Sequence, residues 1–473
     1  MSRRLLPLLA LALTVPACGG SVADRRGATV LFASGADLQS INPLLTVHPL
    51  ARQVQRYVLF TTLVQYDSAL APRPYLARRW EWQNGGRDLV LALDRSVRWH
   101  DGEPTTARDV AWTLTAAKDA ATGYPRAAEL ATLASVEVPD DSTAILRFSA
   151  PPPRFPDILT DLAILPSHLL DSVPPARLRS AAFNEAPVGN GPYRFVAHEA
   201  NRRWVFAANP DFPGSLGGPP ELDRFIVVVV DEPVTKLAAL TSGELDFAGI
   251  QPGHAEFVGR DERLAVVTYP LLFTYALVFN TRRAPFDDFR VRLAADRAID
   301  RREIVDGYLY GFGVPADGPV PPGIPAAPIP PRVTSGASTA GRGARFELLT
   351  VGSGEAALEQ MLQAHLSRAG FDARIRQLEL SAFLDRTYGA REFDAAVLGV
   401  PGDLALAHLI PLTELAGMGI AGDVGVAHRL LVDSLAVSFL YHARGLQGMN
   451  RRVKGVSMDI RGELATLHQW HVR

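Results

Sequence analysis

The sequence predicts an α/β protein built from two or three domains. Its 473 residues exceed the usual size of a single domain. In the second half, a strand at Phe346–Val351, a helix over Leu358–Leu366 and a strand at Ala373–Leu380 form a strand–helix–strand unit. In the first half, a hairpin followed by a capped helix occupies Ala77–Ala117. Strands and helices that alternate along a chain of this length indicate α/β domains with sizeable cores.

The N-terminus has the features of an export signal. Arg3 and Arg4 precede the apolar run Leu5–Val15, which is too short to span a bilayer and has the proportions of a signal peptide. The only cysteine, Cys18, follows this run directly and has no disulfide partner, an arrangement that looks like a bacterial lipobox. We therefore expect residues 1–17 to be a signal peptide, Cys18 to carry the lipid, and residues 18–28 to form a tether. The alternative is an ordinary signal peptide that happens to include Cys18.

Composition narrows the class of partner. The formal net charge is −2, so the chain lacks the basic field that neutralises phosphates, and we expect no nucleic acid as a partner. No other segment approaches the about 18 consecutive apolar residues of a membrane span. The part after Cys18 is therefore predicted to lie outside the cytoplasmic membrane and to be held there by its lipid.

The stretch Ala77–Ala117 is the clearest local prediction. Strands around Trp80–Trp82 and Leu89–Trp99 flank a turn at Asn84-Gly85-Gly86. Thr106 and Asp109 have the spacing of a capping box, and the apolar residues that follow share one helical face.

The other elements follow from apolar periodicity and turn residues. We expect helices over Arg52–Val64, Glu232–Ser242, Leu406–Leu415 and His428–Leu435, and further helices starting at Asp288 and Asp300. We expect strands at Thr29–Ala33, Val136–Val138, Ala144–Phe148, Tyr193–Ala197, Arg203–Ala207, Leu245–Phe247, Thr274–Asn280, Phe393–Val400, Val437–Tyr441 and Arg452–Val456. Phe225–Val230 is apolar throughout and is predicted to be a central strand covered on both faces. Pro315–Pro331 has the composition of a surface linker.

No group of residues in the sequence indicates catalysis or a bound cofactor. His100-Asp101 is the one pair that suggests metal or acid–base chemistry, but no further ligand lies at suitable spacing, and a turn before Gly102 explains it better. Gly189-Asn190-Gly191 leads into Pro192 and a strand, so it is not a phosphate loop. The motifs G-x-S-x-G, H-E-x-x-H and C-x-x-C are absent. We therefore expect a protein that is not an enzyme and has no cofactor.

Several blocks together resemble one family, the family 5 extracellular solute-binding proteins of ABC importers, which includes oligopeptide-, dipeptide- and nickel-binding members. The resemblance covers about Thr29 to Gly313, and its blocks appear in the family's order. They are Ile41-Asn42-Pro43, Leu76-Ala77 with Trp80, Val97 to Thr105 with Ala107 to Val110, Gly189 to Tyr193, Asn209 to Phe212, Leu240 to Asp246, and Phe279-Asn280-Thr281 with Pro285-Phe286 and Arg290 to Arg301.

The resemblance implies a two-lobed, periplasmic-binding-protein-like fold of cluster C with an additional third domain. Lobe I would be discontinuous and would comprise residues 29–45, 182–269 and 443–473. The extra domain, domain II, would span residues 46–181, and lobe II, domain III, residues 270–442. Ligand binding would close the hinge between the two lobes.

The same resemblance implies a function. The protein would sit at the periplasmic or extracellular face of a bacterial membrane, capture short peptides between its lobes and deliver them to ABC permease subunits. Family members pair the peptide main chain with a loop after the first strand, here Ser34, Gly35, Ala36 and Asp37, and with a segment of the opposite lobe, here Val400 and Gly402. An acidic residue in that second segment takes the peptide's amino group, and here only Asp403 can do so.

The sequence departs from the family after Gly399, where Val400 replaces the usual aromatic residue and the region 403–436 is shorter than usual. Asp403 can also be read as a turn residue, and Ser34–Asp37 as a plain loop. Two alternatives therefore stay open. One is a binding-fold lipoprotein that acts as a sensor or scaffold, and the other is a carrier of a non-peptide solute such as a metal chelate, an opine or an oligosaccharide.

Overall fold

The computed structural model describes residues 27–46, 48–324, 340–352, 354–402, 404, 406–419, 421 and 423–472. The expected signal peptide with Cys18, the second half of the Pro-rich segment and Asp403 lie outside the described residues. Among the described residues, no helix is long and apolar enough to cross a membrane.

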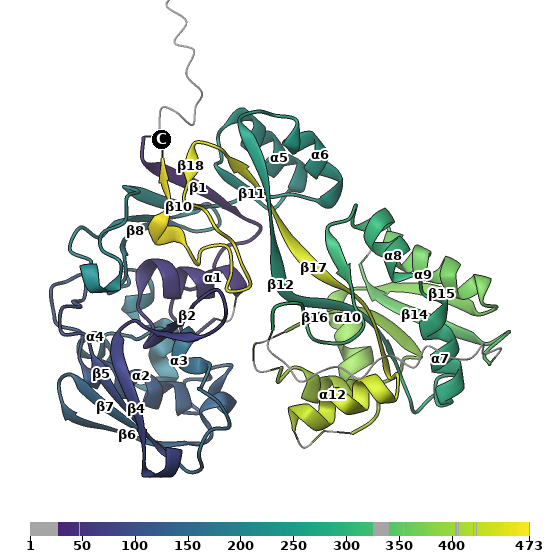
Figure 1. The fold of residues 1–473 in the computed structure, drawn as a ribbon, viewed down its shortest axis with the longest axis horizontal. Helices are drawn as coiled ribbons and strands as arrows, with labels where there is room; N and C mark the ends of the chain where they lie inside the picture. The colour runs from purple at the N-terminus through teal and green to yellow at the C-terminus, as the bar shows by residue number, and fades with distance from the viewer. Residues whose placement is uncertain are drawn as a thin grey trace, which may run out of the picture.

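One mixed sheet runs through both lobes. In the described part of the chain it has 11 strands in the order β15-β14-β16-β12-β17-β11-β1-β10-β9-β8, with β13 paired to β17. Its strands are β1 (Thr29–Ser34), β8 (Tyr193–Glu199), β9 (Arg203–Ala208), β10 (Arg224–Val229), β11 (Phe247–Gly249), β12 (Leu264–Phe279), β13 (Gly313–Pro315), β14 (Arg345–Val351), β15 (Asp372–Leu378), β16 (Ala395–Pro401) and β17 (Val437–Asn450). Figure 1 shows β12 and β17 passing from one half of the molecule to the other.

The two crossing strands are much longer than the sequence suggested. We expected short strands at Thr274–Asn280 and Val437–Tyr441, whereas β12 has 16 residues and β17 has 14. They run antiparallel along most of their length. The pairing of β12 with β17 continues from lobe I into lobe II, so one ladder serves both lobes.

Lobe I contains β1, β8, β9, β10 and β11, with α5 (Pro233–Ser242) and α6 (Ala255–Gly259) on one face. Strand β10 is not covered on both faces, contrary to our expectation. Phe225 and Val227 are buried, but Ile226 and Val228 on the other face are only half-buried. The reason is that α5 packs mainly over β11 and β17, and on this face of β10 only Val228 packs against the cluster that contains Leu240 of α5.

The third domain is built on a four-stranded antiparallel sheet, β4-β5-β7-β6. Its strands are β4 (Ala77–Gln83), β5 (Asp88–Leu93), β7 (Thr143–Phe148) and β6 (Leu133–Asp140). Helix α2 (Ala107–Lys118) packs on this sheet and starts with the predicted capping box, in which the Thr106 N–H donates to the Asp109 carboxylate at 2.7 Å. The remaining α-helices and β-strands between residues 46 and 185 are α1 (Pro49–Val54), β2 (Val64–Tyr66), β3 (Pro72–Pro74), α3 (Ile158–Asp161) and α4 (Ser167–Leu170).

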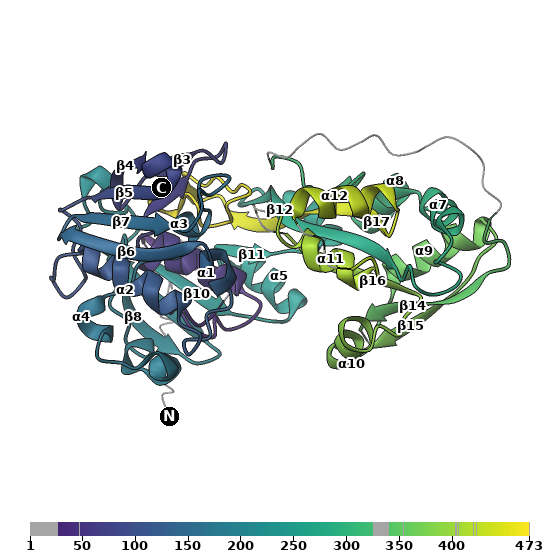
Figure 2. The same cartoon turned by 90° about the horizontal axis from the view of Figure 1, so that it is seen from below.

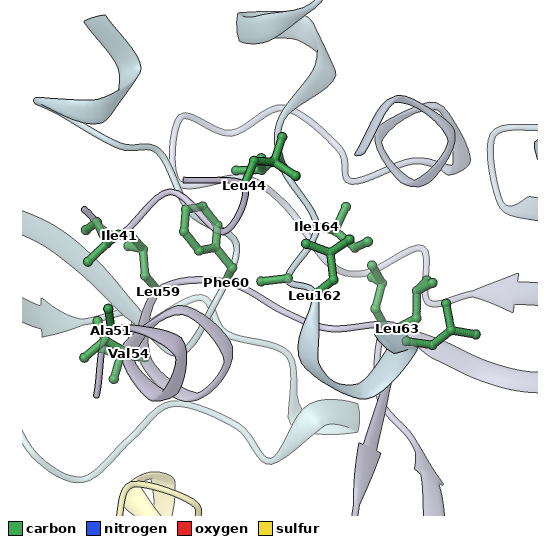
Figure 3. Close-up of a cluster of buried hydrophobic side chains, with 14 of the residues drawn as sticks. Ile41, Leu44, Ala51, Val54, Leu59, Phe60, Leu63, Leu162 and Ile164 are labelled. Atoms are coloured by element: carbon green, nitrogen blue, oxygen red, sulfur yellow. The ribbon is translucent and has the colours of Figure 1, made fainter. Parts of the chain in front are cut away.

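A shared hydrophobic core joins the third domain to lobe I. Figure 3 shows part of it, with side chains that come from the loop after β1, from α1 and from the segments on either side of it and after α3. The expected helix over Arg52–Val64 is confirmed only as far as Leu59, because α1 passes into a π-turn at Gln55–Leu59 and the chain is extended at Phe60. There the Leu59 carbonyl accepts the Gly191 N–H at 2.9 Å, so the helix ends against the Gly-Asn-Gly loop.

Lobe II contains β13, β14, β15 and β16 together with the second half of β12 and the first half of β17. Its helices are α7 (Phe289–Ala298), α8 (Arg301–Glu303), α9 (Ala357–Arg368), α10 (Leu380–Leu384), α11 (Leu409–Leu415) and α12 (Val424–Asp433). In both views the elements from β14 to α12 form one half of the molecule, joined to the other half through β12 and β17 (Figures 1 and 2).

The first part of the predicted Pro-rich linker is packed instead of crossing the surface. Ala316 is fully buried and its N–H donates to the Leu440 carbonyl at 3.1 Å. Ile324 joins the lobe II core beneath α11 and α12. After β17 the chain returns to lobe I and ends with β18 (Val453–Lys454) and β19 (His471–Val472).

Candidate ligand-binding site

The carboxyl ends of parallel strands in the two lobes approach the same stretch of the crossing strands. Strand β11 ends at Gly249, which pairs with Gln447 of β17. Strand β16 ends at Pro401, which pairs with Phe273 of β12. In open α/β sheets, ligands bind outside the carboxyl ends of the strands. The region between the lobes, next to the crossing strands, is therefore the candidate site.

Ser34, Gly35 and Ala36 lie at the carboxyl end of β1, on the lobe I side of this region. The Ser34 side chain is buried, and its hydroxyl donates to the Ala36 carbonyl at 2.6 Å, which fixes the turn. Gly35 and Ala36 are exposed. The loop therefore presents main chain instead of side chains, as peptide pairing requires. Its contact with a ligand remains a prediction.

Asp37 is held by its own lobe. One carboxylate oxygen accepts the Trp204 indole N–H at 2.8 Å, and the other accepts the Asn201 N–H at 2.6 Å and lies 3.2 Å from His198 Nε2. Burial opposes ionisation of Asp37, but these hydrogen bonds outweigh it and lower the pKa of the carboxyl. Asp37 thus fixes the loop on the β8–β9 hairpin, and its predicted ligand contact has no further support in the geometry.

Val400 and Gly402 lie at the end of β16, on the lobe II side. The Val400 side chain is buried in the lobe II core, so only its main chain is left to meet a ligand. The Gly402 N–H donates to the Leu272 carbonyl at 2.7 Å. This bond ties the segment before Asp403 to the crossing strand β12.

The crossing strands contain an irregularity that the sequence analysis missed. Between Pro270 and Thr274 the register of β12 against β17 shifts. Within this bulge, Leu271 packs on the core of lobe I and Leu272 packs on the core of lobe II. The two lobes thus meet at adjacent residues, as expected of a hinge. The uninterrupted apolar run Pro270-Leu271-Leu272-Phe273 was the available signal for it.

Within the described ranges, only a few further side chains connect the lobes. Arg154 of the third domain donates from Nη1 to the Leu404 carbonyl at 3.0 Å. Leu70 and Ile460 pack against the lobe II core. These residues are far apart in sequence and carry no motif, so no sequence signal identified them.

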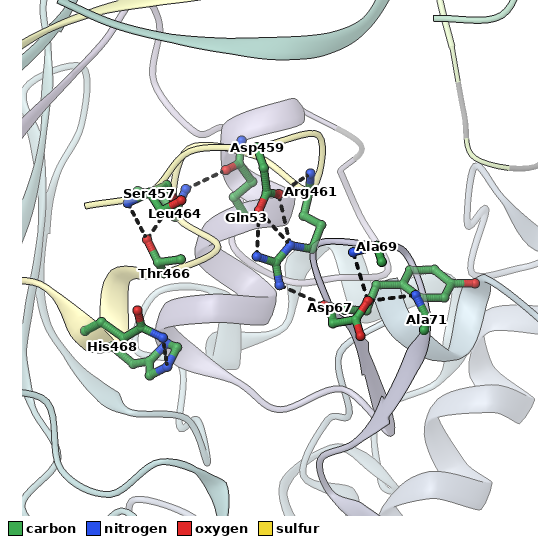
Figure 4. Close-up of polar contacts among 12 residues, drawn as sticks. Gln53, Asp67, Ala69, Ala71, Ser457, Asp459, Arg461, Leu464, Thr466 and His468 are labelled. Atoms are coloured by element: carbon green, nitrogen blue, oxygen red, sulfur yellow. Dashed lines mark hydrogen bonds and ion pairs between the residues drawn. The ribbon is translucent and has the colours of Figure 1, made fainter. Parts of the chain in front are cut away.

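The C-terminal tail holds the loop that carries Leu70 (Figure 4). Arg461 donates from Nη1 to the Tyr66 carbonyl at 2.9 Å and from Nε to Asp459 at 2.9 Å. Burial favours the neutral form of Arg461, but the hydrogen bond to Asp459 is the larger effect and raises the pKa of the guanidinium. Asp67 accepts the N–H groups of Ala69 and Ala71, each at 2.9 Å, and shapes the same loop.

The residues that made the family recognisable lie away from this region. The His100 N–H donates to the Gly189 carbonyl at 2.8 Å, and His100 Nε2 lies 3.0 Å from the Gly191 carbonyl. Burial lowers the pKa of His100 to about 4, so the imidazole is neutral at pH 7. Asn190 accepts the Thr61 N–H at 2.8 Å. The turn at His100 and the Gly-Asn-Gly loop are parts of one structural joint, as the sequence suggested for His100.

The described residues contain no group of three or more His, Cys, Asp or Glu side chains that would hold a metal ion. Two open surface pockets of about 290 and 320 Å³ lie on lobe I alone, one beside Leu264 and Arg451 and the other beside Ile226 and Arg202. Neither has a lobe II residue in its lining, so neither belongs to the region between the lobes.

Comparison with known proteins gives the family. The model of the bacterial extracellular solute-binding proteins, family 5, matches residues 71–409. The chain belongs to this family. It is a family of solute-binding proteins and not a class of enzymes, which agrees with our reading of the sequence.

Relatives carry names from peptide transport. A putative ABC transporter peptide-binding protein of Brucella ovis is 34% identical over 222 residues, which are 47% of this chain and 42% of that protein. The oligopeptide-binding protein AppA of Bacillus subtilis is 26% identical over 319 residues, which are 65% of this chain and 58% of that protein. The chain thus matches about half the length of these relatives.

Solved structures confirm the predicted two-lobed fold. NikZ of Campylobacter jejuni in complex with Ni(L-His) has a TM-score of 0.75 at 20% identity, covering 94% of this chain and 99% of that chain. AppA of Bacillus subtilis in complex with a nonapeptide has a TM-score of 0.73 at 22% identity with the same coverage. A dipeptide-binding protein of Pseudoalteromonas in complex with Met-Leu has a TM-score of 0.76 at 17% identity, covering 94% and 100%.

Proposed function

We propose that this chain is the substrate-binding component of an ABC importer, which captures short peptides between its two lobes and delivers them to permease subunits in the membrane. The observation that carries the proposal is the arrangement of main chain around the hinge. The exposed turn Gly35-Ala36 and the end of β16 lie at carboxyl strand ends of opposite lobes. Main-chain pairing of this kind binds peptides with little regard to their side chains.

The proposal includes the anchoring and the division of the chain. Cys18 would carry the lipid that holds the protein at the periplasmic or extracellular face of the membrane. Residues 29–45, 182–269 and 443–473 would form lobe I, residues 46–181 domain II, and residues 270–442 lobe II. The relatives named for peptide binding support the choice of a peptide as the ligand.

The test is native mass spectrometry of gently purified protein, followed by thermal shift measurements with a library of dipeptides to pentapeptides. We expect co-purified short peptides, and a higher melting temperature with at least part of the library, because a ligand that binds only the folded state stabilises it. A protein that is consistently empty and shows no shift with any peptide would rule the proposal out. The same assay with nickel–histidine, an opine and an oligosaccharide would then address the non-peptide alternatives.

The variant Asp403→Ala tests the predicted amino-group ligand. Loss of a buried ammonium–carboxylate pair is expected to weaken peptide binding by about 2–5 kcal/mol. The matched control is Asp141→Ala, which removes an exposed carboxylate from the third domain and should leave affinity unchanged. Equal affinities of both variants would remove the role assigned to Asp403.

A further inference from the structure

A row of aromatic side chains extends from the hinge into lobe II. Phe273, within the bulge of β12, meets Tyr275 edge-on, with ring centroids 5.4 Å apart and planes at 62°. Tyr275 stacks on Tyr441 of β17, with centroids 4.7 Å apart and planes at 22°. The row therefore begins where the two lobes meet and presents successive ring faces and edges.

Phe273 differs from its neighbours in the bulge. Leu271 and Leu272 each pack into the core of one lobe, whereas Phe273 belongs to none of the hydrophobic clusters among the described residues and is partly exposed. Its ring lies directly on the main chain of Gly399, where an added Cβ would come within 2.4 Å of the ring. The Phe273 ring thus lies at the lobe II edge of the candidate site and is not part of a hydrophobic core.

A carboxylate lies beside the same row. Glu359, in the first turn of α9, accepts the Thr350 hydroxyl at 2.6 Å and is half-buried. No basic side chain pairs with it among the residues that the structure describes. Burial and then the negative charge of Glu359 raise the pKa of Tyr308, and Glu359 also contributes to the raised pKa of Tyr441. Tyr275, Tyr308 and Tyr441 also share one hydrophobic cluster with Leu358 and Leu362 of α9. The carboxylate therefore lies on the helix that packs beside the row.

This cluster faces the opposite lobe. Thr350 lies near the carboxyl end of β14, one of the strand ends that point to the candidate site. Tyr308 is followed by Tyr310, whose ring would lie 3.5 Å from a Cβ added at Gly253 of lobe I. The aromatic row and Glu359 are thus at the edge of lobe II that meets lobe I.

We propose that Phe273, Tyr275, Tyr308 and Glu359 form a binding site for a positively charged nitrogen of the ligand, either an amino group or a basic side chain. Ring faces attract cations through their quadrupole, and an adjacent carboxylate adds a full opposite charge. This inference rests on the proposed peptide function for the source of the nitrogen. It differs from the role of Asp403, because it places a second acid on another element.

Tyr275 and Tyr308 pack against the lobe II core, but this packing does not account for Glu359. A purely structural aromatic row gains nothing from a half-buried carboxylate that lacks a cation, because burying an unpaired charge costs free energy. A bound cation would supply the missing partner of Glu359. A tyrosine hydroxyl has an ordinary pKa of about 10 and is neutral at physiological pH, so the rings carry no charge that would be lost or gained there.

The experiment compares peptides that differ only in charge. Isothermal titration would use Ala-Lys-Ala-Ala and its norleucine analogue, each with a free and an acetylated amino terminus. We expect removal of the recognised charge to weaken binding about tenfold, a loss between those of an exposed and of a desolvated cation–π contact. Norleucine substitution tests the side-chain nitrogen, and acetylation tests the amino group. Because acetylation also removes the group assigned to Asp403, only the part of its effect that Glu359→Gln removes is assigned to this site.

The variant Glu359→Gln is expected to abolish this preference for the charged peptide. Its matched control is Glu379→Gln, which removes an exposed carboxylate next to the carboxyl end of β15 and should keep the preference. Phe273→Leu tests the ring, and a thermal melt of each variant verifies folding. Equal binding of charged and uncharged peptides by the wild-type protein would overturn the proposal and leave the peptide function standing.

Choline chloride probes the site without any peptide. We expect weak binding that Glu359→Gln removes and Glu379→Gln retains. If no peptide binds but choline does, and only Glu359→Gln abolishes it, the cation site stands and the peptide function fails. If neither choline nor peptide charge has an effect, the cation site is disproved.

Discussion

The third domain and lobe II are attached to lobe I in different ways. The third domain shares one hydrophobic cluster with lobe I, in which Phe32 and Phe225 of lobe I join Leu91 and Trp99 of the third domain. Lobe II has hydrophobic clusters of its own. It meets lobe I through the two crossing strands, and only a few other side chains in the described part of the chain connect the lobes. The first attachment makes one rigid body, and the second permits relative movement.

The difference also separates recognition from function. The residues that resemble the family most clearly, such as His100, Asn190 and Gly191, build the joint between the third domain and lobe I. The residues at the movable junction, such as Leu271 and Arg154, belong to no motif. A rigid joint requires particular residues at particular positions, whereas a ligand site in this fold can vary.

The largest expected effect comes from crowding the rigid joint. In Gly189→Ala, the added Cβ would lie 1.9 Å from the Leu59 carbonyl oxygen, which is main chain and cannot move away cheaply. We expect a loss of at least about 3 kcal/mol in the free energy of unfolding, measured by urea denaturation.

Two further glycines complete this measurement. Gly259→Ala is the control, because nothing lies within 4 Å of its added Cβ, and we expect a change within about 0.5 kcal/mol. Gly402→Ala probes the candidate site, where the nearest atom would be 3.4 Å away, and should also be tolerated. If Gly189→Ala were as stable as these two, the joint would not be rigid.

Signals between residues close together in the sequence explain why the elements of the third domain and lobe I could be predicted. The capping box of Thr106 and Asp109, and the glycine after α5, depend on neighbours within a few residues, so the sequence alone identifies them. The fold class followed from such signals and from the family blocks. Several of these blocks lie at the joint between the third domain and lobe I, where only particular side chains fit the packing.

The hinge and the candidate site could not be predicted in the same way. The length of β12 depends on pairing with β17, which lies more than a hundred residues away along the chain. Tyr275 and Tyr441 come together only through the sheet. The helix expected over Arg52–Val64 ends early at Leu59 for a related reason, since its last carbonyl bonds to the distant loop at Gly191. Long-range contacts of this kind leave no periodic signal in the sequence.

The stability of the rigid joint is also expected to depend on pH, through the titration of His100. Burial lowers the pKa of His100 to about 4, below the value of about 6.5 expected in the unfolded chain. The unfolded state therefore binds more protons between these values, and stability falls as the pH drops from about 6.5 to about 4, by about 3 kcal/mol for this group alone. Urea denaturation at pH 8 and pH 4 measures the loss.

His100→Gln should make the protein less sensitive to acid in this range, because the variant has no group there to titrate. His442→Gln extends the comparison to lobe II, since burial also lowers the pKa of His442 to about 4 and its Nδ1 lies 2.9 Å from the Thr274 hydroxyl. If His100→Gln loses stability with acid as steeply as the wild-type protein, the assigned cause is wrong.

The smallest change in stability is expected at the movable junction. Arg154→Ala removes the hydrogen bond from the third domain to the Leu404 carbonyl, but Arg154 is partly exposed and its contacts contribute no more than about 1 kcal/mol to stability. We expect an unchanged melting temperature together with a larger separation of the lobes, measured by small-angle scattering or by fluorescence transfer between labelled lobes. The control is Arg260→Ala. The Arg260 side chain follows α6 directly and forms an exposed ion pair with Glu256 of that helix, so its loss should change neither quantity. A lower melting temperature with an unchanged separation of the lobes would show that Arg154 stabilises the third domain and lobe I instead of linking them to lobe II. Arg154 would then not belong to the movable junction.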